Sequence, residues 1–229
     1  MSVNPVFLAV DTTDLEQAVR LVAAVRPSIG GVKLGLEFFN RHGLAGVEEI
    51  ARGLPLFLDL KLHDIPNTVA GAVAAVASVR PDFLTIHASG GPAMIKAARG
   101  AADLHTNLIA VTVLTSLDDA DLMAVGQHAP VLDQVRRLAD LAQIAGADGV
   151  VCSPLEVTAL RAQCGPDFIL VVPGIRPAGS TLGDQKRVMG PAAALAAGAS
   201  RLVIGRPISA AADPAAAAKA IAAEIGIRS

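Results

Sequence analysis

The stretch Leu54-Pro55-Leu56-Phe57-Leu58-Asp59-Leu60-Lys61-Leu62-His63-Asp64-Ile65-Pro66-Asn67-Thr68 joins an apolar run directly to a charged one. The first half is typical of a buried β-strand. Side chains alternate faces along a strand, so we expect Asp59 and Lys61 to point the same way. Asp64 lies in the turn that follows and can fold back toward them or toward a neighbouring subunit. A lysine held between two acids stays protonated, which predicts that Lys61 is a fixed cation and a proton donor, and a poor nucleophile.

Short β-branched runs alternate with alanine-rich helical stretches from end to end of the chain. We expect strands over residues 6–10, 32–34, 56–60, 83–87, 108–114, 149–152, 168–172 and 201–204. We expect helices over residues 14–25, 37–51, 68–79, 92–102, 131–145, 154–163, 191–197 and 207–225. Eight strand–helix units in 229 residues fit a closed (β/α)8 TIM barrel of the α/β class better than an open doubly wound sheet, with residues 1–229 as one domain.

Composition excludes several classes of function. The formal net charge is -2 and Tyr and Trp are absent, so neither nucleic acid nor an anionic membrane is an expected partner. Apolar stretches are broken before the roughly 18 residues that a transmembrane helix needs, and the N-terminus lacks the basic region of a signal peptide. Cys152 and Cys164 are expected to be buried free thiols, and the cytoplasm is the simplest compartment.

The polar residues fall at the carboxyl ends of the expected strands, where (β/α)8 barrels carry their chemistry. In chain order these residues are Asp11, Lys33, Asp59 with Lys61, His87, Thr115 with Ser116, Arg176 with Gln185, and Gly205 with Arg206. The chain has only five lysines, and two of them project from strand ends toward one mouth. An ion pair that closes the barrel is the alternative reading of Lys33.

The segment 173–185 is long, glycine-rich and polar, and most connections of this kind are short. Arg176 and Gln185 offer donors to an anion, and Gly205 and Arg206 add backbone N–H groups, a guanidinium and an expected helix N-terminus. Loops after the seventh and eighth strands form the recurrent phosphate site of this architecture. The sequence therefore predicts a phosphorylated small molecule as ligand, against the alternative of a flexible surface loop beside a capped helix.

The motif Asp59-x-Lys61-x-His63-Asp64-Ile65-Pro66-Asn67-Thr68 resembles the signature of the orotidine 5′-phosphate decarboxylase family. The resemblance continues through Ala9-Val10-Asp11, Val32-Lys33-Leu34-Gly35, Val113-Leu114-Thr115-Ser116, Pro173-Gly174-Ile175-Arg176 and Ile204-Gly205-Arg206-Pro207-Ile208. It implies the last step of de novo pyrimidine biosynthesis, the conversion of orotidine 5′-phosphate to UMP and carbon dioxide, without metal or organic cofactor.

The resemblance also implies roles for individual residues. Lys61 protonates C6 of the pyrimidine, and Asp59 lies beside the substrate carboxylate. Asp11, Lys33 and Asp64 hold the ribose hydroxyls and the charged network, with Asp64 and Thr68 crossing from the partner subunit of a homodimer. Thr115 and Ser116 match the region that binds the pyrimidine, and Arg176, Gln185, Gly205 and Arg206 match the phosphate grip. Closure of the loop 174–186 over the phosphate is expected. For His63 and His87 we expect structural hydrogen bonds.

Three alternatives remain open from the sequence. Enzymes similar to 3-keto-L-gulonate 6-phosphate decarboxylase or hexulose phosphate synthase share the Asp-x-Lys-x-x-Asp core but use magnesium, with a glutamate ligand where this chain has Lys33. A Schiff-base aldolase needs a neutral lysine, which neighbouring acids oppose. A non-catalytic phosphonucleotide-binding protein would have no reason to place two acids beside an anionic ligand.

Overall fold

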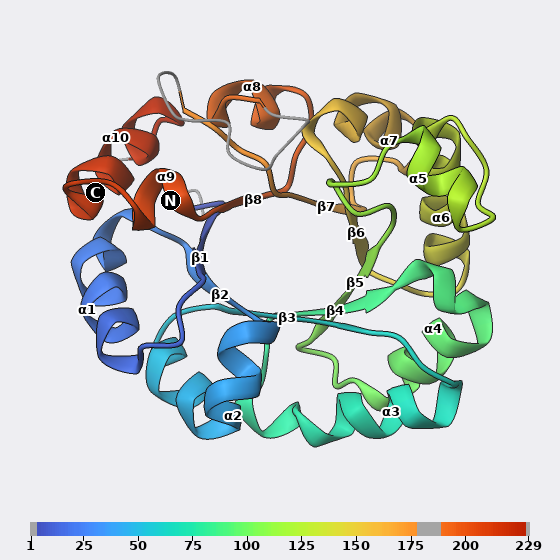
Figure 1. Ribbon diagram of the computed structural model, residues 1–229, viewed down its shortest axis with the longest axis horizontal. Helices are drawn as coiled ribbons and strands as arrows, with labels where there is room; N and C mark the ends of the chain where they lie inside the picture. Colours follow the sequence, from blue (N-terminus) through green and yellow to red (C-terminus); the bar gives the residue numbers. More distant parts are fainter. Residues whose placement is uncertain (1–3, 178–188, 228–229) are drawn as a thin grey trace.

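The computed structural model describes residues 4–177 and 189–227. Within them, parallel strands β1 to β8 close into a barrel in chain order, and helices surround it (Figure 1). The strands are β1 (Val6–Val10), β2 (Gly31–Gly35), β3 (Leu56–Leu62), β4 (Phe83–His87), β5 (Asn107–Val111), β6 (Gly149–Val151), β7 (Ile169–Val172) and β8 (Arg201–Ile204). The predicted TIM barrel is therefore confirmed.

The helices that cover the barrel are α1 (Leu15–Val25), α2 (Leu36–Ala51), α3 (Pro66–Ala75), α4 (Gly91–Ala101), α5 (Asp119–Ala124), α6 (Val131–Ile144), α7 (Val157–Cys164), α8 (Pro191–Ala196), α9 (Arg206–Ser209) and α10 (Pro214–Glu224). Helices α1 to α4, α6 to α8 and α9 begin within three residues of predicted helix starts, whereas α5 and a separate α10 were not predicted. Several start with proline in the first turn, where its missing N–H costs nothing. In the described part of the chain, no helix combines the length and the apolar character needed to cross a bilayer.

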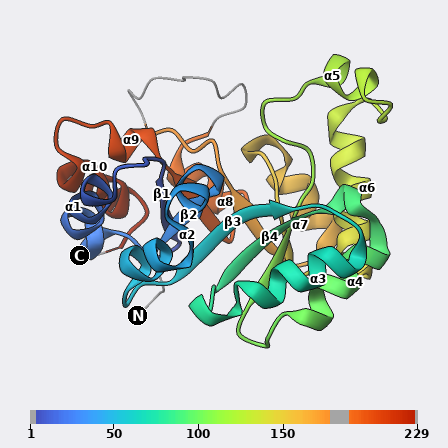
Figure 2. The ribbon, with the colours of Figure 1, turned by 60° about the horizontal axis from the view of Figure 1, so that its bottom comes forward.

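The connection after β5 differs from the prediction. The strand ends at Val111 and not at Leu114, and a short helix that was not predicted, α5, follows. Asp118 starts this helix because its carboxylate accepts hydrogen bonds from the backbone amides of Ala120 and Asp121. The Asp121 carboxylate in turn accepts a hydrogen bond from the Asp118 amide. Figure 2 shows α5 beyond the ring of outer helices, next to α6.

The single helix predicted over residues 207–225 is wrong. The chain forms one turn, α9, and then breaks before α10. Asp213 caps the second helix by accepting the amide of Ala216 at 3.0 Å, and Pro214 fills the first helical position. A proline cannot continue a preceding helix, because it lacks an N–H and its ring clashes with the preceding turn.

The core has two layers that position the site. Outside the strands, a large cluster of aliphatic residues seals the barrel against its helices. Inside, the ring of Phe7 packs edge-on against Phe57 and Phe83, with centroids 6.1 and 5.4 Å apart. Gly31 makes room for this packing, since a Cβ there would lie 2.4 Å from the Phe7 ring. The aromatic plug fills the middle of the barrel, so the polar groups lie above it at the carboxyl ends of the strands.

Candidate active site

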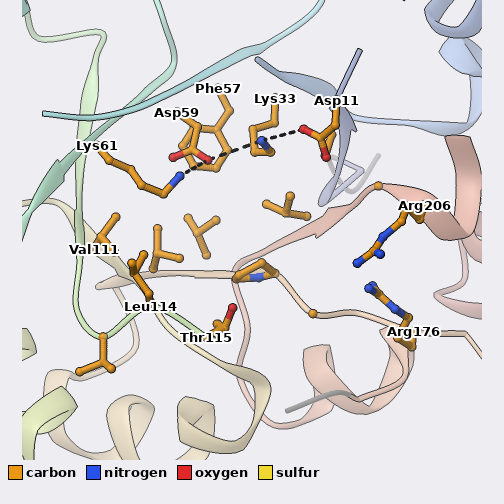
Figure 3. A pocket seen from close by; sticks show the side chains of 18 residues that line it. Asp11, Lys33, Phe57, Asp59, Lys61, Val111, Leu114, Thr115, Arg176 and Arg206 are labelled. Atoms are coloured by element: carbon orange, nitrogen blue, oxygen red, sulfur yellow. Dashed lines mark hydrogen bonds and ion pairs between the residues drawn. The ribbon is translucent and has the colours of Figure 1, made fainter. Parts of the chain in front are cut away.

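A pocket of about 240 Å³ opens at the carboxyl ends of the strands (Figure 3). Its lining residues come from the strand ends and the loops directly after them. They are Ala9, Asp11, Lys33, Phe57, Asp59, Lys61, Val111, Val113, Leu114, Thr115, Val151, Val171, Pro173, Gly174, Arg176, Val203, Gly205 and Arg206. Most residues predicted for the site therefore meet around one cavity.

One wall of the pocket is a row of alternating charges (Figure 3). Lys33 Nζ lies 3.5 Å from Asp11 Oδ1 and 3.5 Å from Asp59 Oδ2, and Lys61 Nζ lies 2.7 Å from the same Asp59 oxygen. Strand register explains the order, because β1, β2 and β3 are neighbours and their inward side chains stand side by side. Each lysine thus has a carboxylate partner, and Asp59 serves both.

The protonation state of Asp59 follows from its surroundings. Burial by itself raises the pKa of this carboxyl. The charges of Lys33 and Lys61, with hydrogen bonds from Lys61 and Thr85, outweigh burial and leave the pKa below its usual value. Asp59 is therefore an anion at neutral pH, although only 8% of the residue is exposed.

The backbone at Lys61 is irregular, and a residue absent from the sequence prediction, Thr85, forms hydrogen bonds at this place. Lys61 has φ of 49°, which L-residues rarely adopt, and the pairing of β3 with β4 shifts register between Leu58 and Leu62. In this shifted stretch the Lys61 amide donates to Thr85 Oγ1 at 2.8 Å, and Thr85 donates to Asp59 Oδ1 at 2.9 Å. A period-two reading of β4 would have marked Thr85, two residues after the inward-facing Phe83.

Two guanidinium groups face each other at the opposite end of the pocket, those of Arg176 and Arg206 (Figure 3). Burial, and then the charge of Arg206, lower the pKa of Arg176 from its ordinary value. Two glycines lie in the chain next to these arginines. Gly174 has φ of 76°, a backbone conformation that favours glycine, and a Cβ on Gly205 would lie 3.4 Å from Asp11 Oδ2. Two cations at one pocket end suit an anion with several oxygens, such as phosphate. The sequence predicted a long helix here. Because α9 is a single turn, its dipole contributes less to anion binding at this end of the pocket than the dipole of a long helix would.

The wall opposite the charged row is largely apolar. Val111 and Leu114 line this wall near Lys61, and Thr115 adds a hydroxyl (Figure 3). A flat ring with polar edges suits such a surface, since apolar faces exclude water while a few polar groups fix orientation. The arrangement therefore fits a ligand with a reacting ring near Lys61 and an anionic group near the arginines.

Four predicted site residues are not among these lining residues. Asp64 is exposed after β3 and accepts the amide of Ile65, so in the single chain it does not fold back to flank Lys61. Thr68 is exposed in the first turn of α3, and Ser116 is exposed in the loop after β5. Gln185, with most of the loop 174–186, lies outside the described residues.

His63 and His87 stack beside Lys61, with ring centroids 5.5 Å apart and planes inclined by 30°. Burial is the main cause that lowers the pKa of His87, and the His63 and Lys61 charges add to it. The charge of Asp59 acts in the opposite direction. His87 is therefore mainly neutral at neutral pH and adds no further cation beside Lys61.

Comparison with known proteins gives a consistent result. Residues 4–221 match the model of the orotidine 5′-phosphate decarboxylase / HUMPS family. The chain is 57% identical over 234 residues to an orotidine 5′-phosphate decarboxylase of Paramagnetospirillum magneticum, covering 98% of this chain and 100% of the relative. It is 57% identical over 223 residues to that of Thermobifida fusca, covering 96% and 95%. The crystal structure of the orotidine 5′-phosphate decarboxylase from Lactobacillus acidophilus superposes with a TM-score of 0.85 at 39% identity, covering 97% and 99%.

Proposed function

Because the chain belongs to the orotidine 5′-phosphate decarboxylase / HUMPS family, we infer that it converts orotidine 5′-phosphate to UMP and carbon dioxide. This reaction is the last step of UMP synthesis. The observation that carries the assignment is the pocket itself. A carboxylate–lysine row at one end and two guanidinium groups at the other match a substrate with a reacting acid ring and a phosphate.

Lys61 is the proton donor in this proposal. Breaking the bond from C6 to the carboxylate carbon releases carbon dioxide and leaves the electron pair on C6. That pair takes a proton from the Lys61 ammonium, and the resulting amine regains a proton from solvent. Before the transfer, the fixed positive charge stabilises the developing carbanion, which is the largest contribution of many active sites. The contact of Lys61 Nζ with Asp59 supports the role, because it holds the cation in place before substrate arrives.

Asp59, Lys33 and Asp11 keep this cation oriented and bind the middle of the substrate. Asp59 lies beside Lys61 and so also beside the departing carboxylate, whose ground state it would raise in energy. Lys33 lies one strand away from Asp59, on β2, and Asp11 lies two strands away, after β1. Both suit the ribose hydroxyls, since a carboxylate accepts and an ammonium donates hydrogen bonds. Thr115 and Ser116 are proposed to contact the pyrimidine edge.

Arg176, Arg206 and the Gly205 amide bind the phosphate in this proposal, with Gln185 as a further donor. Binding energy from a phosphate remote from C6 can be used to orient the ring and to exclude water. Closure of the loop 174–186 would serve the same end and stays a prediction.

Asp64 and Thr68 are proposed to act in the neighbouring site of a homodimer. Both are exposed, Asp64 between β3 and α3 and Thr68 in the first turn of α3, and Ile65 between them is 67% exposed. A solvent-exposed isoleucine flanked by these polar residues suits a surface that a second copy covers. A cytoplasmic location also stays a prediction, in keeping with a small-molecule substrate.

The magnesium-dependent members of the same family are the nearest alternative. Chelation of a divalent cation by Asp11 and Asp59 would have to displace Lys33, whose ammonium lies 3.5 Å from both carboxylates. The donor set therefore disfavours a metal between them.

The deciding experiment follows the absorbance of orotidine 5′-phosphate with purified protein after EDTA treatment. Decay that survives chelation is expected from a decarboxylase that needs no metal. Decay that EDTA abolishes and magnesium restores would favour the metal-dependent alternative. No decay by folded protein that still binds UMP would indicate a binding protein and overturn the proposed function.

A further inference from the structure

Thr85 occupies a position that no role in the reaction yet explains. It lies on β4, two residues after Phe83 of the aromatic plug, and its exposure is 0%. It is not among the residues that line the pocket in the described part of the chain. A ligand in the pocket therefore cannot reach the hydroxyl, and any effect of Thr85 on catalysis must pass through its neighbours.

The hydroxyl closes a ring of hydrogen bonds around Lys61. The Lys61 amide donates to Thr85 Oγ1 at 2.8 Å, and the Thr85 hydroxyl donates to Asp59 Oδ1 at 2.9 Å. The other oxygen of Asp59 accepts from Lys61 Nζ at 2.7 Å. Backbone and side chain of Lys61 are thus tied to the same carboxylate through one threonine.

The ring forms at the irregular place in the barrel wall. Leu58 pairs with Leu84 and Leu62 pairs with Ile86, so four residues of β3 span the length of two on β4. Lys61 lies within this bulge with φ of 49°, a conformation that persists only where surrounding contacts enforce it. In this bulge the Thr85 hydroxyl accepts a hydrogen bond from the Lys61 amide.

We propose that Thr85 is a positioning residue that sets the Lys61 ammonium and the Asp59 carboxylate in their reactive geometry. The proposal rests on the proposed function for its kinetic consequence, although the ring itself can be tested without turnover. Loss of the hydroxyl removes one bond from a buried anion and one from a strained amide, and both changes move Lys61 relative to the substrate carbon.

The charged and titratable groups that face Asp59 determine what the hydroxyl can change. They are Lys33 from β2, Lys61 on the same strand and His87 from β4, with Asp11 from β1 beyond Lys33. Asp59 is anionic at neutral pH, and the charges of the two lysines favour that form more than the hydrogen bond from Thr85 does. The Thr85 hydroxyl therefore affects the pKa at which Asp59 takes up a proton in acid, because its hydrogen bond favours the carboxylate form.

The test compares Thr85→Val, which keeps the shape and removes the hydroxyl, with Thr85→Ser, which restores it. Thr106→Val is the matched control, because Thr106 is a buried threonine before β5 whose hydroxyl donates to Pro81 at 2.9 Å, away from the pocket. We expect Thr85→Val to lower kcat by about 10- to 100-fold with little change in KM, as for loss of a hydrogen bond to a charged group. Thr85→Ser should recover most of the loss, and Thr106→Val should keep wild-type kcat.

A second readout does not depend on turnover. Titration of the Asp59 carboxyl carbon, followed by NMR with Asp59→Asn for assignment, should give a higher pKa in Thr85→Val than in wild type and Thr85→Ser. Unchanged kcat and unchanged titration in folded Thr85→Val would overturn the proposal, as would equal kcat losses in Thr85→Val and Thr106→Val. Should Thr85→Val not fold, Thr85→Cys, a poor donor, takes its place with the same expected order. If the wild-type protein lacks decarboxylase activity, the proposed function fails. The NMR comparison still tests whether Thr85 holds Asp59 and Lys61 through the ring of hydrogen bonds.

Discussion

Lys61 and Asp59 form the shortest ion pair of the charged row, with 2.7 Å between Nζ and Oδ2, and the lysine side chain is the more exposed of the two, at 30% against 11%. The carboxylate is thus fixed inside the barrel while the ammonium reaches toward the pocket. Contacts with two lysines and a threonine restrict the movement of the buried Asp59 carboxylate. Asp59 therefore acts as the anchor, and it holds the Lys61 ammonium at the surface of the pocket, where a ligand can meet it.

Replacing Lys61 by alanine should abolish decarboxylation while binding of UMP stays measurable. The substitution removes the proposed proton donor and leaves the arginines at the other end of the pocket in place. Turnover is measured by absorbance and UMP affinity by calorimetry. Near-normal turnover would remove Lys61 from its proposed role, and loss of UMP binding by a folded variant would make Lys61 a residue needed for ligand binding.

Replacing Arg206 by alanine should weaken phosphate-bearing ligands far more than the bare nucleoside. Loss of one charge-assisted contact is worth about 1.5–3 kcal/mol, or roughly one to two orders of magnitude in affinity for UMP. Affinities for UMP and uridine are compared by calorimetry. Arg52→Ala is the control, because Arg52 is an exposed arginine paired with Glu49 outside the pocket. Equal losses for UMP and uridine would place the phosphate elsewhere.

Mixing two inactive variants should restore activity if Asp64 serves the neighbouring site. A dimer of one Lys61→Ala chain and one Asp64→Ala chain has one site with both defects and one with neither. Random exchange should then give about a quarter of wild-type activity, since half of the dimers are mixed and each has one intact site. The measurement needs subunit exchange, checked by light scattering and by one tagged chain.

Two other outcomes would contradict the crossing of Asp64. No recovery in mixed dimers of proven composition would assign Asp64 to its own chain or to no site. A monomer in solution with full activity would remove the partner subunit from the mechanism. In the single chain Asp64 accepts only its neighbour's amide among the interactions described, so either result is compatible with the fold.

The barrel could be predicted from the sequence because each strand is a short apolar run and each helix is a separate alanine-rich stretch. The predicted bounds of β1, β4 and β8 agree with the structure. The end of β5 could not be predicted, because the next residues, Thr112, Val113 and Leu114, are each either β-branched or apolar and so continue the pattern of the strand. The break between α9 and α10 was missed although Asp213 and Pro214 together signal a helix start.

The pocket could be predicted from the rule that chemistry lies at strand ends, and this placed Asp11, Lys33, Asp59 and Lys61 correctly around one cavity. Thr85 was missed because its part depends on a bulge between β3 and β4. The period-two pattern of β4 indicates that Thr85 faces inward, but it does not show that the hydroxyl meets the Lys61 amide. The place of Asp64 was left open for a similar reason. A strand pattern fixes which way Asp59 points, whereas a residue in a turn takes its direction from contacts outside its own segment.

The pH dependence of stability should carry the signature of His87. Burial and the neighbouring His63 and Lys61 lower its pKa from 6.5, so the folded state binds this proton less readily than the unfolded state does. As the pH falls from about 6.5 to the lowered value, the unfolded chain takes up the proton first and the free energy of unfolding decreases. Above this window the contribution of His87 is fully present, and below it both states are protonated and the slope vanishes. Urea unfolding of wild type and His87→Gln across pH 5 to 7.5 measures the effect, and the variant should show a smaller slope. An equal slope, or an NMR titration of the His87 ring with a midpoint at or above 6.5, would show that burial does not control this histidine.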